Sequence, residues 1–210
     1  MFDPVHLGHL QAAHLARERC GLDEVRLVPC GQPVHRPAAV TPAAERCAMV
    51  ALAAAAEPWL LLDSRECDSD APSRTWTTLQ SLKAEQPDCD LYCILGMDAF
   101  LSLPSWYRWR ELFDLAHLVV IRRPESGGST EEPGEELAAA CAGRWVQAGE
   151  PMPAGPAGAV ILVPQASRPL SSTEVREALR QGREVDGLLP VAVANYIHAQ
   201  HLYQQNGVRI

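Results

Sequence analysis

Residues 91–98 read Leu-Tyr-Cys-Ile-Leu-Gly-Met-Asp, a short apolar run that ends in a glycine and, two positions later, an acidic residue. A run of this length predicts a buried strand over 91–95. Further short apolar runs of the same kind stand at 25–28, 60–63, 118–121 and 160–163. Strands that are apolar throughout are typical of parallel sheets covered on both faces, so the sequence predicts such a sheet.

Helices are predicted between and after these strands. Apolar residues at helical spacing predict a helix from about Leu10 to Cys20, which ends at Gly21, a common residue at a helix C-terminus. Similar patterns predict helices over 42–57, 77–85, 106–115, 135–141, 172–181 and 190–202. The alternation of strands and helices predicts an α/β domain with a doubly wound parallel sheet.

Length and charge limit the possible classes of protein. A chain of 210 residues favours a single domain over 1–210, with the Pro-, Gly- and Glu-rich residues 124–157 as a surface excursion. Its 18 Lys and Arg against 26 Asp and Glu give a net charge of −8, which disfavours generic binding to nucleic acid. The net charge does not exclude a local basic pocket that binds a phosphate.

The sequence has the features of a cytoplasmic protein. It has no run of 18 apolar residues that would predict a transmembrane helix. The N-terminus has an early aspartate and two histidines rather than a basic region followed by an apolar one, so it is not a signal peptide. The seven cysteines are odd in number and include no CxxC pair, which predicts reduced thiols.

The first chemical motif is the segment 3–9, Asp-Pro-Val-His-Leu-Gly-His. His6 and His9 stand on either side of Gly8, where a helix begins. Because the free amides of a helix N-terminus bind anions, two imidazoles at this place add donors for a phosphate. Gly8 has no side chain and lets a ligand approach the backbone closely. The alternatives are a metal-binding pair and two ordinary surface histidines.

The second motif is the segment 171–176, Ser-Ser-Thr-Glu-Val-Arg. Ser171 and Glu174 fit a capping box, in which each side chain accepts a hydrogen bond from the other residue's main chain. The hydroxyls, the free amides of the first turn and Arg176 would equally hold a polyphosphate. From the residues alone, a capped helix and a phosphate site both stay open.

Three further segments carry candidate ligand contacts. Gly96 and Asp98 directly follow a predicted strand, and ligands of open α/β sheets bind outside the carboxyl ends of strands. Residues 106–109, Trp-Tyr-Arg-Trp, form either core or interface, or offer a ring that stacks on a flat ligand. Residues 32–36, Gln-Pro-Val-His-Arg, form either a solvated loop or a basic loop that contacts the ligand.

Taken together, these segments resemble the bacterial nicotinate-nucleotide adenylyltransferase family of the HxGH nucleotidyltransferase superfamily. The resemblance runs in order along nearly the whole chain. It is carried by FDPVHLGH at 2–9, PCGQPVHR at 29–36, SRTWTTL at 73–79, LGMDAFLSLPSWYRW at 95–109, LSSTEVR at 170–176 and LLPVAVANYIHAQHLY at 188–203. The HxGH and STxxR motifs mark the superfamily, and the DAFxxLPxW and QPxHR stretches favour this member.

The resemblance implies an enzyme of NAD biosynthesis that converts ATP and nicotinate mononucleotide into deamido-NAD and pyrophosphate, usually with Mg²⁺. The 5′-phosphate of the acceptor attacks the α-phosphorus of ATP in line. No protein nucleophile is needed, so the enzyme supplies positioning and charge stabilisation.

The same resemblance assigns roles to individual residues. His6 and His9 are the catalytic residues, which bind the phosphates of ATP and stabilise the transition state. The ATP-binding residues are Gly8, Gly96, Asp98, Ser172, Thr173 and Arg176. The residues that bind the acceptor are His35, Arg36, Arg74, Thr75 and Trp106, and the Trp106 ring stacks on the pyridine. Arg46 is a weaker candidate, and no side chain is expected to ligate a resident metal ion.

The chain departs from the family pattern in two places. Where the family commonly has a string like SYTxDTL, this chain has Arg74 and Thr77, and Arg74 could itself contact a carboxylate or phosphate. The family usually opens with an apolar strand and Gly-Gly-Thr before Phe-Asp-Pro, whereas Met1 stands here at the third of these positions. Because a central strand pairs with two neighbours, its loss would leave both without partners. We therefore expect Met1 to be an internal methionine of a longer natural chain.

Other activities remain as alternatives. Pantetheine-phosphate adenylyltransferase shares HxGH and STxxR, but its family is typically shorter and lacks the LPSWYRW segment. A preference for nicotinamide mononucleotide is a second alternative, because this compound differs from nicotinate mononucleotide only by an amide in place of the carboxylate. A non-catalytic nucleotide-binding relic is the alternative that is not an enzyme. The intact motifs speak against the relic. The expected partners are ATP and nicotinate mononucleotide, with no nucleic acid and no membrane, and the sequence leaves a homo-oligomer open.

Overall fold

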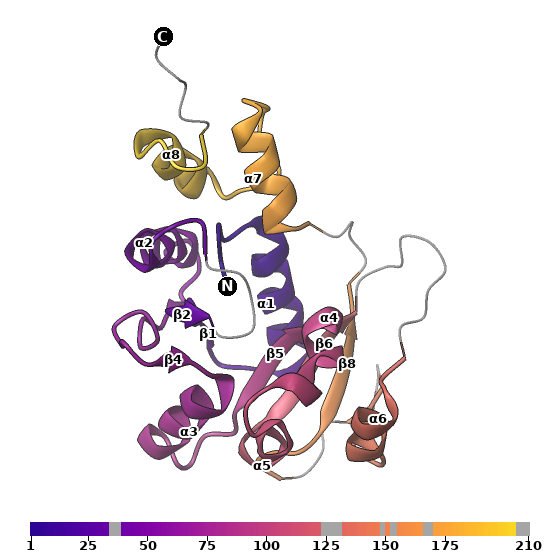
Figure 1. The fold of residues 1–210 in the computed structure, drawn as a ribbon. Coiled ribbons are helices and arrows are strands. Elements are labelled where there is room, and N and C mark those ends of the chain that lie inside the picture. The colour runs from indigo at the N-terminus through magenta and orange to yellow at the C-terminus, as the bar shows by residue number, and fades with distance from the viewer. Residues whose placement is uncertain (34–38, 123–131, 148–149, 152–154, 166–169, 205–210) are drawn as a thin grey trace. The chain divides into compact units, whose positions relative to one another are not determined.

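The computed structural model describes residues 1–33, 39–122, 132–147, 150–151, 155–165 and 170–204 (Figure 1). The chain divides into two compact units. The first consists of residues 1–11, 23–73 and 170–210, and the second of residues 12–22 and 74–169. Helix α1 (Leu7–Cys20) begins in the first unit and continues into the second, and it ends at Gly21, whose positive φ of 63° suits glycine.

The first unit contains two short parallel strand pairs. Strand β1 (Val25–Leu27) pairs with β3 (Leu60–Leu62), so the strands predicted over 25–28 and 60–63 are confirmed with slightly shorter bounds. Strand β2 (Gln32–Pro33) pairs with β4 (Pro72–Ser73), a pair that was not predicted. Two-residue strands give no periodic hydrophobic signal.

The helices of the first unit are α2 (Ala43–Ala54), α7 (Ser172–Arg180) and α8 (Val191–Ala199). Prolines stand at the N-cap of α2 and of α8, where no intrahelical N–H bond is required. Helix α2 contacts both β3 and α8 and buries Met49 and Val50. All three helices are predicted from the sequence, with ends a few residues longer than those observed.

The second unit is built on a four-stranded parallel sheet in the order β5-β6-β8-β7. Its strands are β5 (Tyr92–Gly96), β6 (His117–Arg122), β8 (Val160–Pro164) and β7 (Trp145–Val146). Three of the four were predicted as apolar runs, and the parallel α/β fold class is confirmed.

Both faces of this sheet are covered, which explains why β6 is apolar throughout. Leu118 and Val120 join one core, to which α5 and α6 contribute. Val119 and Ile121 point the other way, into a core that includes Ala16 and Cys20 of α1. Since successive residues of a strand point to opposite faces, a strand covered on both sides has no polar face.

The remaining helices of the second unit are short. They are α3 (Thr75–Glu85), α4 (Met97–Leu101), α5 (Leu112–Leu115) and α6 (Glu135–Cys141), with 3₁₀ turns at Leu103–Ser105 and Trp109–Glu111. The single helix predicted over 106–115 is wrong in its first half, because Trp106 is extended and Arg108 is left-handed with a φ of 52°. The Arg108 guanidinium pairs with Glu111 at 2.5 Å, a contact that this turn permits.

Part of the predicted surface excursion over 124–157 contributes to the core. Helix α6 forms where the sequence predicts it and buries Leu137 and Cys141 completely. Strand β7, which was not predicted, pairs with β8 at the edge of the sheet.

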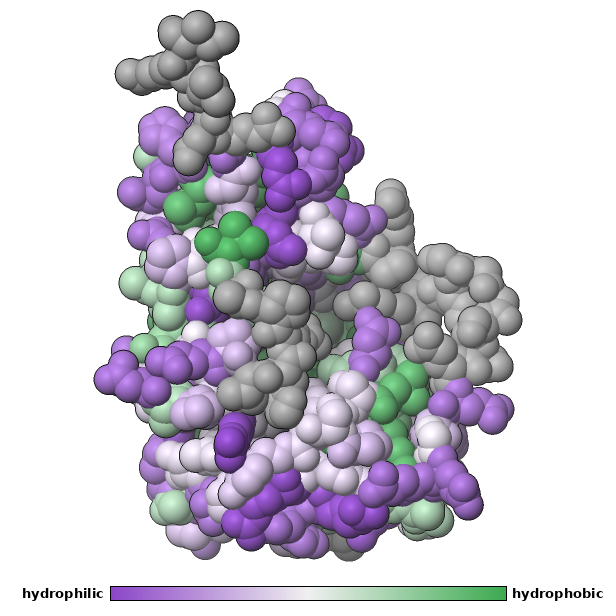
Figure 2. Space-filling model, viewed as in Figure 1, coloured by the Kyte–Doolittle hydropathy of each residue, from purple (hydrophilic) through white to green (hydrophobic). Residues whose placement is uncertain are grey.

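The surface over α3 and α5, at the lower edge of the face in Figure 2, is mostly hydrophilic.

The sequence predicts no transmembrane helix and predicts reduced cysteines. Among the described residues, no helix combines the length and the hydropathy that a membrane crossing needs. The seven cysteines all carry free thiols.

Candidate active site

The histidine pair of the 3–9 motif lies at the first turn of α1. The main-chain amides of His9 and Leu10 donate to the carbonyl of His6, at 2.9 and 3.4 Å, and so begin the helix. The rings of His6 and His9 stack with centroids 3.7 Å apart. The main-chain amide of His6 donates to Nδ1 of His9 at 3.2 Å, so the neutral ring carries its proton on Nε2. His9 therefore has a directed N–H donor at a helix N-terminus.

The packing around Gly8 favours a residue without a side chain. A Cβ added at Gly8 would lie 3.1 Å from Nδ1 of His6 and 3.3 Å from Cβ of Leu170. The missing side chain thus lets the His6 ring pack over the first turn of α1. It also lets the segment before α7 come close.

The start of α7 is a complete capping box. The amide of Glu174 donates to the Ser171 hydroxyl at 3.2 Å, and the amide of Ser171 donates to the Glu174 carboxylate at 3.0 Å. The capped-helix interpretation of this motif is therefore correct. It does not exclude the phosphate interpretation, because Ser172, Thr173 and Arg176 are not part of the box.

Two of those side chains, Ser172 and Arg176, connect α7 to the first motif. The Ser172 hydroxyl donates to the carbonyl of Pro4 at 3.1 Å, and Arg176 Nη1 donates to the carbonyl of Asp3 at 2.6 Å. Arg176 Nη2 also donates to the Thr173 hydroxyl at 3.3 Å. In Figure 1 the beginning of α7 lies beside the beginning of α1. The structure thus brings together the HxGH and STxxR motifs within one unit.

Asp3 lies at the centre of this junction, although the sequence analysis assigned no role to it. Its side chain is buried, with 2% of the residue exposed, and both carboxylate oxygens accept hydrogen bonds. The amide of Val40 donates to Oδ2 and the hydroxyl of Tyr203 donates to Oδ1, each at 2.7 Å. Buried carboxylates need hydrogen-bond donors, but this general rule does not show that Val40 and Tyr203 are the donors to Asp3.

Arg46, the weaker candidate, is a buried structural residue of α2. It is 2% exposed, and its guanidinium donates to the main-chain carbonyls of Cys30, Gly31 and Thr41. These carbonyls precede and follow residues 34–38 in the sequence. The candidates His35 and Arg36 lie outside the described residues.

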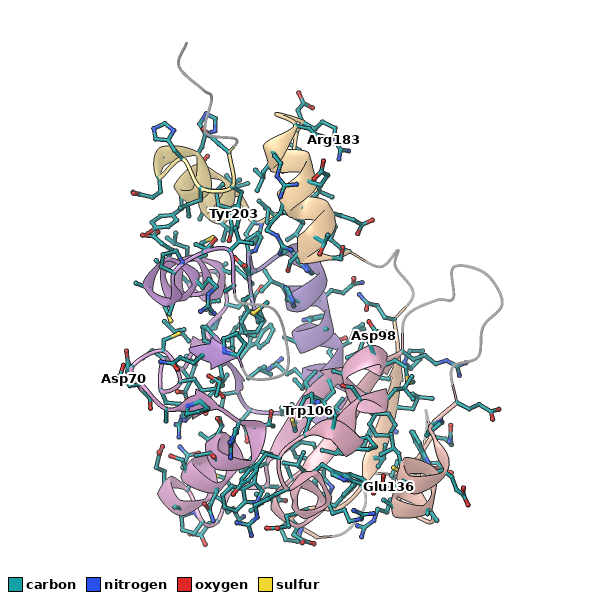
Figure 3. All side chains as sticks on the ribbon, in the orientation of Figure 1. Asp70, Asp98, Trp106, Glu136, Arg183 and Tyr203 are labelled. Atoms are coloured by element: carbon teal, nitrogen blue, oxygen red, sulfur yellow. The ribbon has the colours of Figure 1, made fainter. Side chains whose placement is uncertain are left out.

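Two ATP-binding candidates belong to the second unit. Gly96 ends β5 and is the N-cap of α4, and Asp98 lies exposed in the first turn of that helix. No described atom lies within 4 Å of a Cβ built at Gly96, so the packing of the described residues does not require glycine there. Figure 3 labels Asp98 on this helix and Trp106 on the segment that follows it.

The acceptor candidates of the second unit lie next to a cluster of aromatic and arginine side chains. Arg74 is the N-cap of α3 and Thr75 is the first residue of that helix. The Arg74 guanidinium stacks over the Tyr107 ring at 4.1 Å. Trp106 packs partly buried against the core and donates through Nε1 to the Ser102 hydroxyl at 3.2 Å.

The cluster also includes Arg108 of the predicted 106–109 segment, and Trp76 and Glu111, to which the sequence analysis assigned no role. Trp76 packs edge-on against Tyr107 with ring centroids 5.8 Å apart, and the Arg108 guanidinium stacks over the Trp76 ring at 3.9 Å. Glu111 accepts from both Arg108 and the Trp76 indole. The Arg108 hydrogen bond lowers the pKa of Glu111 below its ordinary value.

The described residues hold no group of three or more His, Cys, Asp and Glu side chains that could bind a metal ion.

Comparison with known proteins identifies the class. The model of the cytidylyltransferase-like family matches residues 1–178. The chain therefore belongs to the cytidylyltransferase-like family.

Individual relatives narrow the class further. A protein of Pseudomonas aeruginosa named "Probable nicotinate-nucleotide adenylyltransferase" is 43% identical over 97% of this chain and 94% of its own length. A protein of the same name from Methylococcus capsulatus is 42% identical over 96% of this chain and 95% of its own length. The resemblance to nicotinate-nucleotide adenylyltransferases is confirmed.

The fold also has solved counterparts. The Plasmodium falciparum nicotinic acid mononucleotide adenylyltransferase complexed with NaAD superposes with a TM-score of 0.71 at 17% identity. The superposition covers 96% of this chain and 93% of that chain. The complex of the same protein with APC gives a TM-score of 0.68 at 16% identity over 96% and 92% of the two chains.

Proposed function

We propose that this chain is an adenylyltransferase that joins ATP and nicotinate mononucleotide to give deamido-NAD and pyrophosphate. The observation that carries the proposal is the meeting of segments 3–9 and 171–176, two phosphate-type motifs from opposite ends of the sequence. The acceptor follows from relatives that bear the name of this activity and match almost the whole chain.

The reaction is a single in-line displacement at the α-phosphorus of ATP. An oxygen of the 5′-phosphate of nicotinate mononucleotide forms a bond to that phosphorus. The bond from the α-phosphorus to the bridging oxygen breaks, and pyrophosphate leaves with its electrons. No covalent intermediate with the protein is needed, so the chain has to position two anions and stabilise charge on the transferring group.

The first unit supplies the groups for the triphosphate. His9 donates through Nε2–H, and His6 is held against it by the ring stack. Arg176 has five N–H donors, of which two engage Asp3 and Thr173. In this proposal the guanidinium and the hydroxyls of Ser172 and Thr173 hold the β- and γ-phosphates, while the histidines face the α-phosphate.

The second unit supplies contacts to the adenosine and to the acceptor. Gly96 and Asp98 stand at the carboxyl end of β5, where open α/β sheets bind ligands. Thr75 lies in the first turn of α3, whose free amides can donate hydrogen bonds to the nicotinate carboxylate. Arg74 adds a cation to that contact, and Trp106 stacks on the pyridine ring. His35 and Arg36 are proposed to contact the acceptor phosphate.

Mg²⁺ enters this proposal as part of the substrate MgATP. The described side chains form no carboxylate or imidazole group that would hold the ion by itself. When bound with ATP, the ion neutralises charge on the phosphates and so assists the departure of pyrophosphate. The protein's own residues bind and orient the complex.

We assign the reaction to the cytoplasm, since seven free thiols suit a reducing compartment. We also propose that the chain works as one nucleotidyltransferase domain. Its oligomeric state, for which the sequence leaves a homo-oligomer open, is measured by analytical ultracentrifugation.

Product analysis tests the proposed reaction. The purified chain is incubated with ATP, Mg²⁺ and one of three acceptors: nicotinate mononucleotide, nicotinamide mononucleotide or phosphopantetheine. Mass spectrometry should detect deamido-NAD as the preferred product. A preference for either of the other acceptors, or no product with any of them, contradicts the proposal.

A matched pair of histidine variants ties the product to the site. His9→Ala removes the donor at the start of α1, and His14→Ala removes an exposed imidazole of the same helix that pairs with Glu18 at 3.2 Å. Deamido-NAD formation should fall strongly in the first variant only. An equal fall in both would mean that the loss reflects the helix rather than the site.

A further inference from the structure

The end of the described chain reaches the phosphate-binding groups through one buried contact. Tyr203 follows α8 and is left-handed, with a φ of 61°. Its hydroxyl donates to Oδ1 of Asp3, a residue 200 positions away in the sequence, at 2.7 Å. Figure 3 labels Tyr203 beside α8 in the first unit.

The Tyr203 phenol is buried and hydrogen-bonded to Thr41 and Asp3. Burial raises its pKa well above the ordinary value, the Thr41 hydroxyl, which bonds to it, lowers that pKa, and the Asp3 carboxylate raises it again. The phenol therefore stays protonated and remains a donor to Asp3.

Asp3 contacts both the Tyr203 phenol and the Arg176 guanidinium. The carboxylate is nearly inaccessible to water and each of its oxygens has a donor, so its orientation is fixed by those donors. The main-chain carbonyl of the same residue accepts from Arg176 Nη1 at 2.6 Å. Asp3 is therefore in contact with the Tyr203 phenol through its side chain and with the Arg176 guanidinium through its main chain.

We propose that Tyr203 is a positioning residue for the triphosphate-binding groups, acting through Asp3 on Arg176. The inference rests on the proposed function, since it takes Arg176 as a contact of the triphosphate. Tyr203 lies outside both the HxGH and the STxxR motifs. Without this role, the residues after α8 would contribute only to the stability of the fold.

The test is a double-mutant cycle with binding as its readout. The probe is α,β-methylene-ATP, which binds as a triphosphate and does not transfer its adenylyl group. Tyr203→Phe keeps the ring and removes only the donor. A displaced Arg176 guanidinium weakens a charge-assisted hydrogen bond to the triphosphate, so the affinity should fall about tenfold. In an Arg176→Ala background the same substitution should change the affinity less than about twofold.

Tyr196→Phe is the matched control. The Tyr196 hydroxyl, on α8, donates to the Glu45 carboxylate at 2.8 Å, so its loss removes the same kind of hydrogen bond away from the junction. It should leave the affinity unchanged in both backgrounds. Thermal melts of every variant give the accompanying change in stability.

A purely structural role predicts a different result. If Tyr203→Phe lowers the melting temperature and leaves the affinity within twofold of the parent, the proposal is overturned. It is equally overturned if the loss is tenfold in both backgrounds, because the effect would not pass through Arg176.

A second variant covers the case in which Tyr203→Phe does not fold. Asp3→Asn keeps a side chain of the same size but no longer offers two acceptor oxygens to Val40 and Tyr203. The same pattern is expected: lower affinity when Arg176 is present and no further loss when it is absent. Equal losses in both backgrounds overturn the proposal.

Turnover then separates this inference from the proposed function. If the parent chain makes no deamido-NAD but the cycle shows coupling, Tyr203 positions a triphosphate site and the reaction assignment fails. If the parent makes deamido-NAD and the cycle shows no coupling, the reaction stands and the role of Tyr203 fails.

Discussion

A methyl group at Gly8 should slow the reaction while it leaves the fold nearly as stable. In Gly8→Ala the new Cβ would stand 3.1 and 3.2 Å from two atoms of the His6 ring and 3.3 Å from Cβ of Leu170, whereas ordinary contacts begin at 3.4 Å. Leu170 Cβ is fixed to the backbone and yields little. The His6 ring must therefore move by a few tenths of an ångström, and it is stacked on His9.

The expected magnitudes follow from that shift. If 1 Å of misplacement costs about 100-fold, a few tenths should lower kcat by roughly three- to tenfold. Overpacking costs about 1 kcal/mol, and replacing glycine by alanine in a helix returns up to about 1 kcal/mol. The net change in unfolding free energy should therefore be close to zero.

Steady-state turnover at saturating ATP and nicotinate mononucleotide, with thermal melts of the same samples, measures both effects. Gly134→Ala is the control for turnover, because no described atom lies within 4 Å of a Cβ there and its φ is −56°. A Gly8→Ala variant with the kcat of the parent would refute the claim that the His6 ring position limits the reaction. A melting temperature lowered by ten degrees or more would refute the estimate of the packing cost.

Four further outcomes are expected. His9→Ala should lower kcat by about two to three orders of magnitude, and near-normal turnover would remove His9 from the transition state. Trp106→Ala should raise KM for nicotinate mononucleotide more than KM for ATP, and the opposite pattern would end the stacking assignment. Gly31→Ala places Cβ 2.0 Å from a main-chain carbonyl oxygen and should lower the unfolding free energy by about 3 kcal/mol in urea titrations, whereas a loss under 1 kcal/mol would show that the backbone yields. Burial raises the pKa of Asp63, but Arg65 hydrogen bonds lower it below 3.8 overall, so this carboxylate stabilises the fold above that pH and loses the effect as the pH falls. Asp63→Asn should therefore flatten the decline in unfolding free energy between about pH 5 and pH 2, and an unchanged decline would mean that the Asp63 contacts do not matter to stability.

The main elements of the fold could be predicted because their burial is written into local patterns. β6 is apolar at successive positions since both of its faces are covered, and the apolar spacing of α1 ends at a glycine that suits a positive φ. β2 and β4 could not be found, because two residues carry no period and each contains a proline. At the break, Arg108 stacks over Trp76, a tertiary contact between residues 32 positions apart that leaves no local signal.

The site divides in the same way between local and distant information. The positions of the two motifs at helix starts could be predicted from their own residues. Their hydrogen bonds to each other could not, because Ser172 and Arg176 reach the main-chain carbonyls of Pro4 and Asp3. A carbonyl acceptor has no side-chain identity that a sequence pattern could show. Arg46 is similar, since its guanidinium donates to the main-chain oxygens of Cys30, Gly31 and Thr41.

These backbone contacts change how substitutions in the STxxR motif have to be interpreted. Buried carbonyls need donors, and that of Asp3 obtains one from Arg176 outside regular secondary structure. Arg176→Ala would therefore remove the proposed phosphate contact and leave the Asp3 carbonyl without this donor, in the segment that precedes His6 and α1. Its effect on activity would exceed the contribution of the guanidinium to binding ATP. Tyr203 is three contacts away from the ligand in this proposal, through Asp3 and Arg176. Its coupling to Arg176 therefore measures how much of the motif's effect depends on the position at which Asp3 holds the guanidinium.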